Sequence, residues 1–100
     1  MEEQLRDYEK SITEQLVKVA SNIELLEAWI SNYEYHFWVL EASKNQLGKE
    51  KYDEEYDAII KRFGASAKKH KKELETLRGL QSSLKNALGF VASHFYKGGK

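Results

Sequence analysis

The stretch LVKVASNIELLEAWISNYEYHFWVL (residues 16–40) decides the fold, because its apolar residues repeat with the spacing of a coiled coil. Steps of three and four residues alternate along one stripe, which consists of Leu16, Val19, Ile23, Leu26, Ile30, Tyr33, Phe37 and Leu40. A heptad pattern of this length is typical of a long α-helix that packs against another helix along a narrow seam. The stripe extends downstream to Leu47 and upstream through Ile12, Tyr8 and Leu5. We therefore predict a helix over residues 3–47.

A second stripe with the same spacing predicts a second helix over residues 53–97. Its members are Tyr56, Ile59, Phe63, His70, Leu74, Leu77, Gln81, Leu84, Leu88, Val91 and Phe95. Between the helices we predict a polar turn over residues 48–52, with Gly48 as a left-handed cap and Asp53 as the next N-cap. Gly64 leaves two arrangements open, because a glycine either sits within a continuous helix or ends a short one at residue 63 and creates three helices.

Composition favours one helical domain over residues 1–97, followed by a flexible tail at 98–100. The 100 residues include no proline, which would break helices, and no cysteine, which excludes disulfides and thiolate metal sites. We find neither an apolar leader after Met1 nor an apolar run of about 18 residues that would span a bilayer. We therefore expect an all-α, soluble, cytoplasmic protein without a membrane partner.

The charge is segregated along the chain although the net charge is zero. Residues 1–57 hold 14 acidic and 6 basic residues, a net charge of −8, whereas residues 58–100 hold 10 basic and 2 acidic residues, a net charge of +8. Folding the chain at Gly48 would place the later bases beside Glu24, Glu27 and Glu34. The segregation is therefore explained largely by an antiparallel helical hairpin that pairs with itself.

An aromatic belt, residues 25–40 together with 52–63, is the main sign of function. Residues 25–40 are apolar on almost every side, and the facing segment 52–63 adds further apolar residues, whereas a two-helix hairpin buries only one side of each helix. One flank is expected to hold Leu25, Trp29, His36 and Val39, and the other Tyr35, Trp38 and Ala42. Either another helix of the chain covers this excess, or a second copy or another protein does. We favour the second interpretation, in which two hairpins form a four-helix bundle. The predicted interface comprises Leu25, Trp29, Tyr33, Tyr35, His36, Phe37, Trp38, Tyr52, Tyr56, Ile60 and Phe63.

The basic segment 61–72 offers a second kind of site. Its cations are expected to contact phosphates in a nucleic acid or another anion, or to form a solvated helix face. They are Lys61, Arg62, Lys68, Lys69, Lys71 and Lys72. The pair His70 and Glu73 reverses the order of the Glu-x-x-His motifs of metal-binding bundles, so we predict no metal site. No residue pattern indicates a catalytic group or a cofactor, and we predict that the chain is not an enzyme.

The mid-chain turn Gln46-Leu47-Gly48 in a cysteine-free chain of this length resembles the WXG100 family of secreted helical hairpins, which dimerise as four-helix bundles. The family's Trp-x-Gly motif is not present, because the tryptophans stand at 29 and 38, and no acidic residue follows Tyr96. The resemblance covers architecture and implies a secreted hairpin effector as a third possible function. At the level of fold, phage and plasmid accessory proteins offer a similar analogy. The leading prediction remains a homodimeric protein-interaction module, acting as an adaptor, a scaffold or an inhibitor of an unidentified protein.

Overall fold

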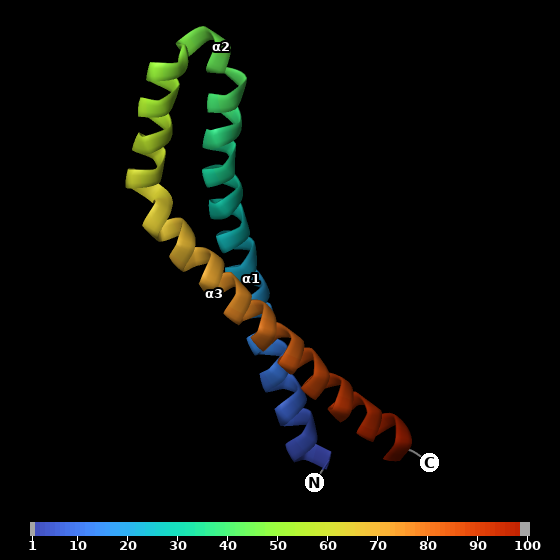
Figure 1. Ribbon diagram of the computed structural model, residues 1–100. Helices are drawn as coiled ribbons and strands as arrows, with labels where there is room; N and C mark the ends of the chain where they lie inside the picture. Colours follow the sequence, from blue (N-terminus) through green and yellow to red (C-terminus); the bar gives the residue numbers. More distant parts are fainter. Residues whose placement is uncertain (1, 99–100) are drawn as a thin grey trace. The chain divides into compact units, whose positions relative to one another are not determined.

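The protein is all-α, as predicted. The computed structural model describes residues 2–98, with the side chains described through residue 94. Helix α1 spans Glu2–Ala42, the short α2 spans Lys44–Leu47 and α3 spans Lys49–Gly98 (Figure 1). Within the described range only Ser43 and Gly48 are not helical, and α1 packs against α3 in a hairpin-like arrangement. Gly98, predicted to lie in the tail, ends α3, whereas residues 99–100 lie outside the described residues.

The first long helix ends at Ala42, earlier than the predicted residue 47, because Ser43 interrupts it. The Ser43 hydroxyl donates a 3.0 Å hydrogen bond to the carbonyl oxygen of Val39, and its backbone N–H is shared between the carbonyls of Val39 and Leu40 at 3.1 Å. Serine hydroxyls that bond back to the preceding turn compete with the regular ladder and bend the helix. Residues 44–47 therefore form the separate single turn α2.

The connection between α2 and α3 is Gly48 alone, so the predicted polar turn over 48–52 and the N-cap at Asp53 were wrong. Gly48 has φ 80° and ψ 161°, which confirms the positive φ but places the residue in an extended region that only glycine adopts readily. Its N–H donates to the Lys44 carbonyl at 3.2 Å, and its carbonyl accepts from the N–H of Tyr52 at 3.0 Å. One residue thus ends α2 and starts α3.

The second long helix is continuous through Gly64, so the alternative of a break at this residue is not observed. A Cβ at Gly64 would lie 3.4 Å from Cγ2 of Ile60, which is close to an ordinary contact, and the helix continues on both sides of the glycine.

Ion pairs stabilise the first turns of α3. Nζ of Lys51 lies 3.9 Å from Oε2 of Glu54 and 3.4 Å from Oε1 of Glu55.

Two compact units divide the chain, and both helices contribute to each. The terminal unit comprises Met1–Glu24 and Glu75–Lys100, of which residues 2–24 and 75–98 are described. Its buried apolar side chains are Ile12, Val19, Ile23 and Val91. Tyr8, predicted to lie in the seam, is instead 57% exposed, while the adjacent Glu9 is half-buried. Glu9 continues the regular alternation of three and four residues from Ile12 to Leu5, whereas Tyr8 would require two successive steps of four.

The turn unit comprises Leu25–Leu74 and contains α2. Leu26, Ile30, Tyr33 and Phe37 of its predicted seam are half-buried, and Leu40 and Leu74 are buried. Ala67, which the second stripe omitted, is 3% exposed and lies four residues after Phe63 and three before His70. It therefore occupies a regular seam position with a small side chain.

Candidate partner-binding surface

The predicted aromatic belt lies within the turn unit, where its rings divide into an internal group and an external pair. The internal group, here called the aromatic column, is a continuous series of ring contacts between the two helices of this unit. It consists of Trp29, Tyr33, His36, Phe37, Tyr52, Tyr56, Phe63 and His70. Heptad spacing puts these rings in one place, because residues three and four apart share a helix face.

Trp29 contacts three other rings of the column, at the end of the column far from the turn. Its ring lies 5.9 Å from Tyr33, 6.5 Å from Phe63 and 4.6 Å from His70, centroid to centroid. His36 stacks on Phe63 at 5.5 Å with an angle of 9° between the planes. Trp29 was predicted on a flank, but these contacts assign it to the seam that joins α1 to α3.

The column continues toward the turn through Phe37. Its ring lies 5.0 Å from Tyr33 and 5.1 Å from Tyr56, and Tyr56 in turn lies 6.2 Å from Tyr52. Edge-on and offset ring pairs in this distance range each contribute about 0.5–1.5 kcal/mol beyond the burial of their area. Most of the belt's aromatic residues therefore stabilise the hairpin-like turn unit itself.

A polar contact closes the column near the turn. The Tyr52 hydroxyl donates a 2.7 Å hydrogen bond to Oε2 of Glu41, and Nζ of Lys44 lies 5.1 Å from the centre of the Tyr52 ring. The hydrogen bond to the Glu41 carboxylate is the largest cause that raises the pKa of Tyr52 above its ordinary value of 10.0, followed by desolvation and the negative charge of Glu41. The contact thus joins the last turn of α1 to the first turn of α3.

The external pair consists of Tyr35 and Trp38, which point away from the seam. Their rings stack at 5.8 Å with an angle of 22° between the planes, yet the two residues remain 57% and 66% exposed. At about 100° per residue, Tyr35 lies roughly 160° around the helix from the seam residue Phe37. Both residues were predicted on the same flank, and no ring contact joins them to the column in the described part of the chain.

Other exposed apolar residues extend this outer face of α1. Leu25 is 67% exposed and Val39 is 41% exposed. Val39 follows Tyr35 by four residues, so the two share one helix face, although they were predicted on opposite flanks. The alanines at 28 and 42 are also exposed. On α1, the excess apolar surface therefore lies on the side of the helix away from the intramolecular seam.

The remaining predicted interface residues lie at the edge of the column on α3. Tyr56 and Ile60 are each 42% exposed, and Phe63 is half-buried beneath the Arg62 guanidinium, whose Cζ lies 5.2 Å from the ring centre. Seven of the eleven predicted residues therefore belong to the column, although His36 and Tyr56 remain exposed within it, and the four outside it are exposed as well: Leu25, Tyr35, Trp38 and Ile60. The heptad step distinguishes the column from the external pair already in the sequence, because it selects Tyr33 and Phe37 and omits Tyr35 and Trp38.

The basic segment of α3 is exposed at each predicted position: Lys61, Arg62, Lys68, Lys69, Lys71 and Lys72. Helical spacing places Lys61, Lys68 and Lys72 on one face and directs the others to either side. The cations therefore surround much of the helix. The expected pairing with acids of α1 remains a prediction.

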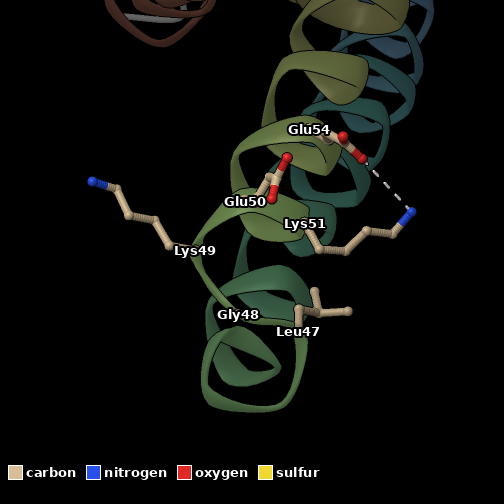
Figure 2. A pocket seen from close by; sticks show the side chains of 6 residues that line it. All are labelled: Leu47, Gly48, Lys49, Glu50, Lys51 and Glu54. Atoms are coloured by element: carbon tan, nitrogen blue, oxygen red, sulfur yellow. Dashed lines mark ion pairs between the residues drawn. The ribbon is translucent and has the colours of Figure 1, made fainter.

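A hollow of about 420 Å³ lies at the turn (Figure 2). Its lining comes from the end of α2 and the start of α3: Leu47, Gly48, Lys49, Glu50, Lys51 and Glu54. Figure 2 shows the Lys49 side chain extending away from Lys51, which reaches toward Glu54. Because consecutive residues of one turn line this space, it is a feature of the helix junction and lacks opposed walls that would enclose a small molecule.

Among the described residues, neither a metal site nor a membrane-spanning helix is found. No group of three or more His, Asp or Glu side chains in residues 2–98 is placed to hold a metal ion. No helix in this range combines the length and apolar character needed to cross a membrane.

Comparisons of the chain with models of known protein families, with curated proteins and with solved structures found no significant match.

Proposed function

We propose that the chain is a non-enzymatic protein–protein interaction module, which binds through the outer face of α1 in the turn unit and self-associates as part of that role. The observation that carries the proposal is the Tyr35–Trp38 pair, stacked at 5.8 Å and left mostly exposed. Trp and Tyr are the residue types that most often anchor protein interfaces. An adaptor, a scaffold and an inhibitor all fit this surface.

The free energy that burial of the Tyr35–Trp38 pair would release supports its role as an anchor. A fully buried aromatic side chain removes roughly 150–250 Å² from water. With the exposed fractions of Tyr35 and Trp38, burial of both would remove about 250 Å², or roughly 6 kcal/mol at 25 cal/mol per Å². Association costs at least about 4 kcal/mol in lost freedom of motion. The pair is thus a strong anchor that still needs neighbours such as Leu25 and Val39.

A capture experiment with matched variants tests the proposal. Wild-type protein, a Trp38→Ala variant and a Phe90→Ala variant are used as baits in lysate of the native host. Phe90 is a suitable control because it is 76% exposed and lies in the terminal unit. We expect a protein that is retained by wild type and Phe90→Ala but lost from Trp38→Ala. Equal retention by all three baits would contradict the proposed surface.

A gel-retardation assay with the same variants tests whether the basic segment binds nucleic acid. Retardation of DNA or RNA by both variants, with an affinity that falls steeply as salt rises, would favour the cations of residues 61–72. Loss of protein binding in Trp38→Ala with no retardation at moderate salt would favour the aromatic face.

A further inference from the structure

The outer face of α1 contains a second heptad pattern, which neither the seam nor the aromatic column uses. Its six positions, here called the outer stripe, are Leu25, Ala28, Asn32, Tyr35, Val39 and Ala42. They step by three, four, three, four and three residues, and all six are exposed. Alternating steps of this kind are the pattern by which one helix packs against another. One face of α1 already packs in the seam, so the outer stripe is a second packing face on the same helix.

We propose that the outer stripe binds a second copy of this chain, with the two α1 helices antiparallel and a two-fold axis passing between Asn32 and Tyr35. This inference rests on the proposed function, since it names the occupant of that surface. In a two-fold dimer the same patch on both copies must fit itself. The stripe therefore has to be self-complementary in size and in charge.

Side-chain size is complementary in this register. The two-fold axis places Leu25 opposite Ala42 of the second copy, and Val39 opposite Ala28. Tyr35 then lies opposite the smaller Asn32 at the centre. Each layer pairs a larger side chain with a smaller one, as close packing requires. A parallel register instead places Leu25 on Leu25, Tyr35 on Tyr35 and alanine on alanine, so that layers alternate between crowded and empty.

Trp38 supports the same register from beside the stripe. It occupies a position that flanks the helix contact, and the nearest flanking residue of the antiparallel copy is Ser31. A large exposed ring therefore again meets a small side chain. The Tyr35–Trp38 stack at 5.8 Å is already formed in one copy, so little side-chain freedom remains to be lost on binding.

Charge is also compatible with a second copy. None of the six stripe positions carries a charge, and of the flanking positions 22, 24, 29, 31, 36, 38, 43 and 45 only Glu24 does, with histidine neutral. In the antiparallel register Glu24 lies nearest to Asn45 of the second copy, so like charges do not meet. An acidic or basic partner would find no charged complement on this face.

The available area indicates a weak dimer. The stripe runs over 18 residues, from 25 to 42, or about 27 Å at 1.5 Å per residue. With the exposed area of the two aromatic rings, such a contact buries about 500 Å² on each copy, near the lower limit for specific protein interfaces. We therefore expect a dissociation constant in the micromolar range.

Cysteine cross-linking tests the register directly, because the natural chain contains no cysteine. Ala28→Cys and Val39→Cys each change one exposed residue. We expect a mixture of the two variants to form a disulfide-linked dimer under mild oxidation, and each variant alone to remain unlinked. In the proposed register position 28 lies 11 residues from position 28 of the other copy, about 16 Å, which is too far for a disulfide. Efficient linking of Ala28→Cys with itself would overturn the antiparallel register.

Sedimentation over a range of concentrations measures the dimer itself. We expect Trp38→Ala and Ala28→Lys each to weaken dimerisation at least tenfold and Phe90→Ala to leave it unchanged, with unaltered helix content in all three. A wild-type chain that stays monomeric at a protein concentration of about 100 times the expected micromolar dissociation constant would overturn the inference. If that monomer still captures a protein in a Trp38-dependent way, only the second-copy inference fails. If capture is also insensitive to Trp38→Ala, the proposed function fails with it.

Discussion

The indole of Trp29 meets the imidazole of His70 edge to face, with the ring centroids 4.6 Å apart and the planes at 69°. This contact places a polar ring in the apolar seam of the turn unit. Nδ1 of His70 is buried and has no hydrogen-bond partner among the described residues. Oε2 of Glu73 lies 3.5 Å away, which is an ion pair only when the imidazole is protonated. The unsatisfied nitrogen is a local cost within an otherwise apolar seam.

Replacement of that ring by an apolar side chain should stabilise the protein. Relief of an unsatisfied buried polar atom contributes about 1–3 kcal/mol, whereas loss of one edge-to-face contact costs about 0.5–1.5 kcal/mol. We expect His70→Leu to raise the free energy of unfolding by about 1 kcal/mol, measured by urea denaturation followed by circular dichroism. Glu73→Gln is the control and should change stability by less than about 0.5 kcal/mol. A clear loss of stability in His70→Leu would instead show that a hydrogen bond or ion pair of the imidazole stabilises the folded protein.

Two glycines should respond in opposite directions to the same substitution. Gly48→Ala forces a Cβ into the backbone conformation at φ 80° and ψ 161°, at a cost of about 1–3 kcal/mol. Gly79 lies within α3, and a Cβ there meets nothing within 4 Å, so Gly79→Ala should stabilise the helix by about 0.5–1 kcal/mol. Thermal unfolding of both variants measures the two shifts. A Gly48→Ala variant as stable as wild type would contradict the assigned turn conformation.

The Tyr52 hydroxyl should titrate above its ordinary pKa of 10.0, because it donates to the Glu41 carboxylate. Since the folded pKa is raised, this contact contributes stability below about pH 10 that is lost as pH rises through the higher folded pKa. Ultraviolet difference titration of the phenolate in wild type and in Glu41→Gln measures the shift. The variant should bring the pKa of Tyr52 back toward 10.0, and a titration identical to that of wild type would rule out the hydrogen bond. The part of the titration that is lost in Tyr52→Phe identifies the absorbance change that belongs to Tyr52.

Ala67 and Ala65 provide a matched pair for the seam. Ala67 is buried whereas Ala65 is exposed, although both lie in the same turns of α3. Ala67→Leu adds three carbon atoms to a packed position and should cost about 1–3 kcal/mol. Ala65→Leu should change stability by less than about 0.5 kcal/mol. Chemical denaturation of the two variants distinguishes them, and equal effects would mean that α1 and α3 do not pack closely at Ala67.

The long helices and most seam positions were predictable from the sequence because one physical constraint fixes them. A narrow contact between helices requires apolar side chains every three and four residues, and large residues such as Val19, Leu40 and Leu74 reveal that requirement. Ala67 satisfies it equally well but adds little to the hydrophobic pattern, so it was omitted. Tyr8 was assigned to the seam because it is apolar, but the regular alternation of steps places the polar Glu9 there instead.

The turn and the outer stripe were less predictable, for different reasons. Ser43 interrupts α1 through a hydrogen bond to its own preceding turn, a local competition that polar and apolar spacing does not record. Gly48 supports a one-residue connection, whereas the charged residues after it suggested a longer one. The outer stripe contains Asn32 and two alanines, so its heptad spacing was hidden among the denser apolar residues of the first seam.

The contact between Glu41 and Tyr52 also suggests an order of folding. These residues are separated by 11 positions, whereas Trp29 and His70 are separated by 41. The entropy lost on closing the longer loop exceeds that for the shorter one by about 1 kcal/mol. We therefore expect the turn unit to nucleate beside Gly48 and to add the rings of its aromatic column outward, each new contact closing only a few more residues of chain.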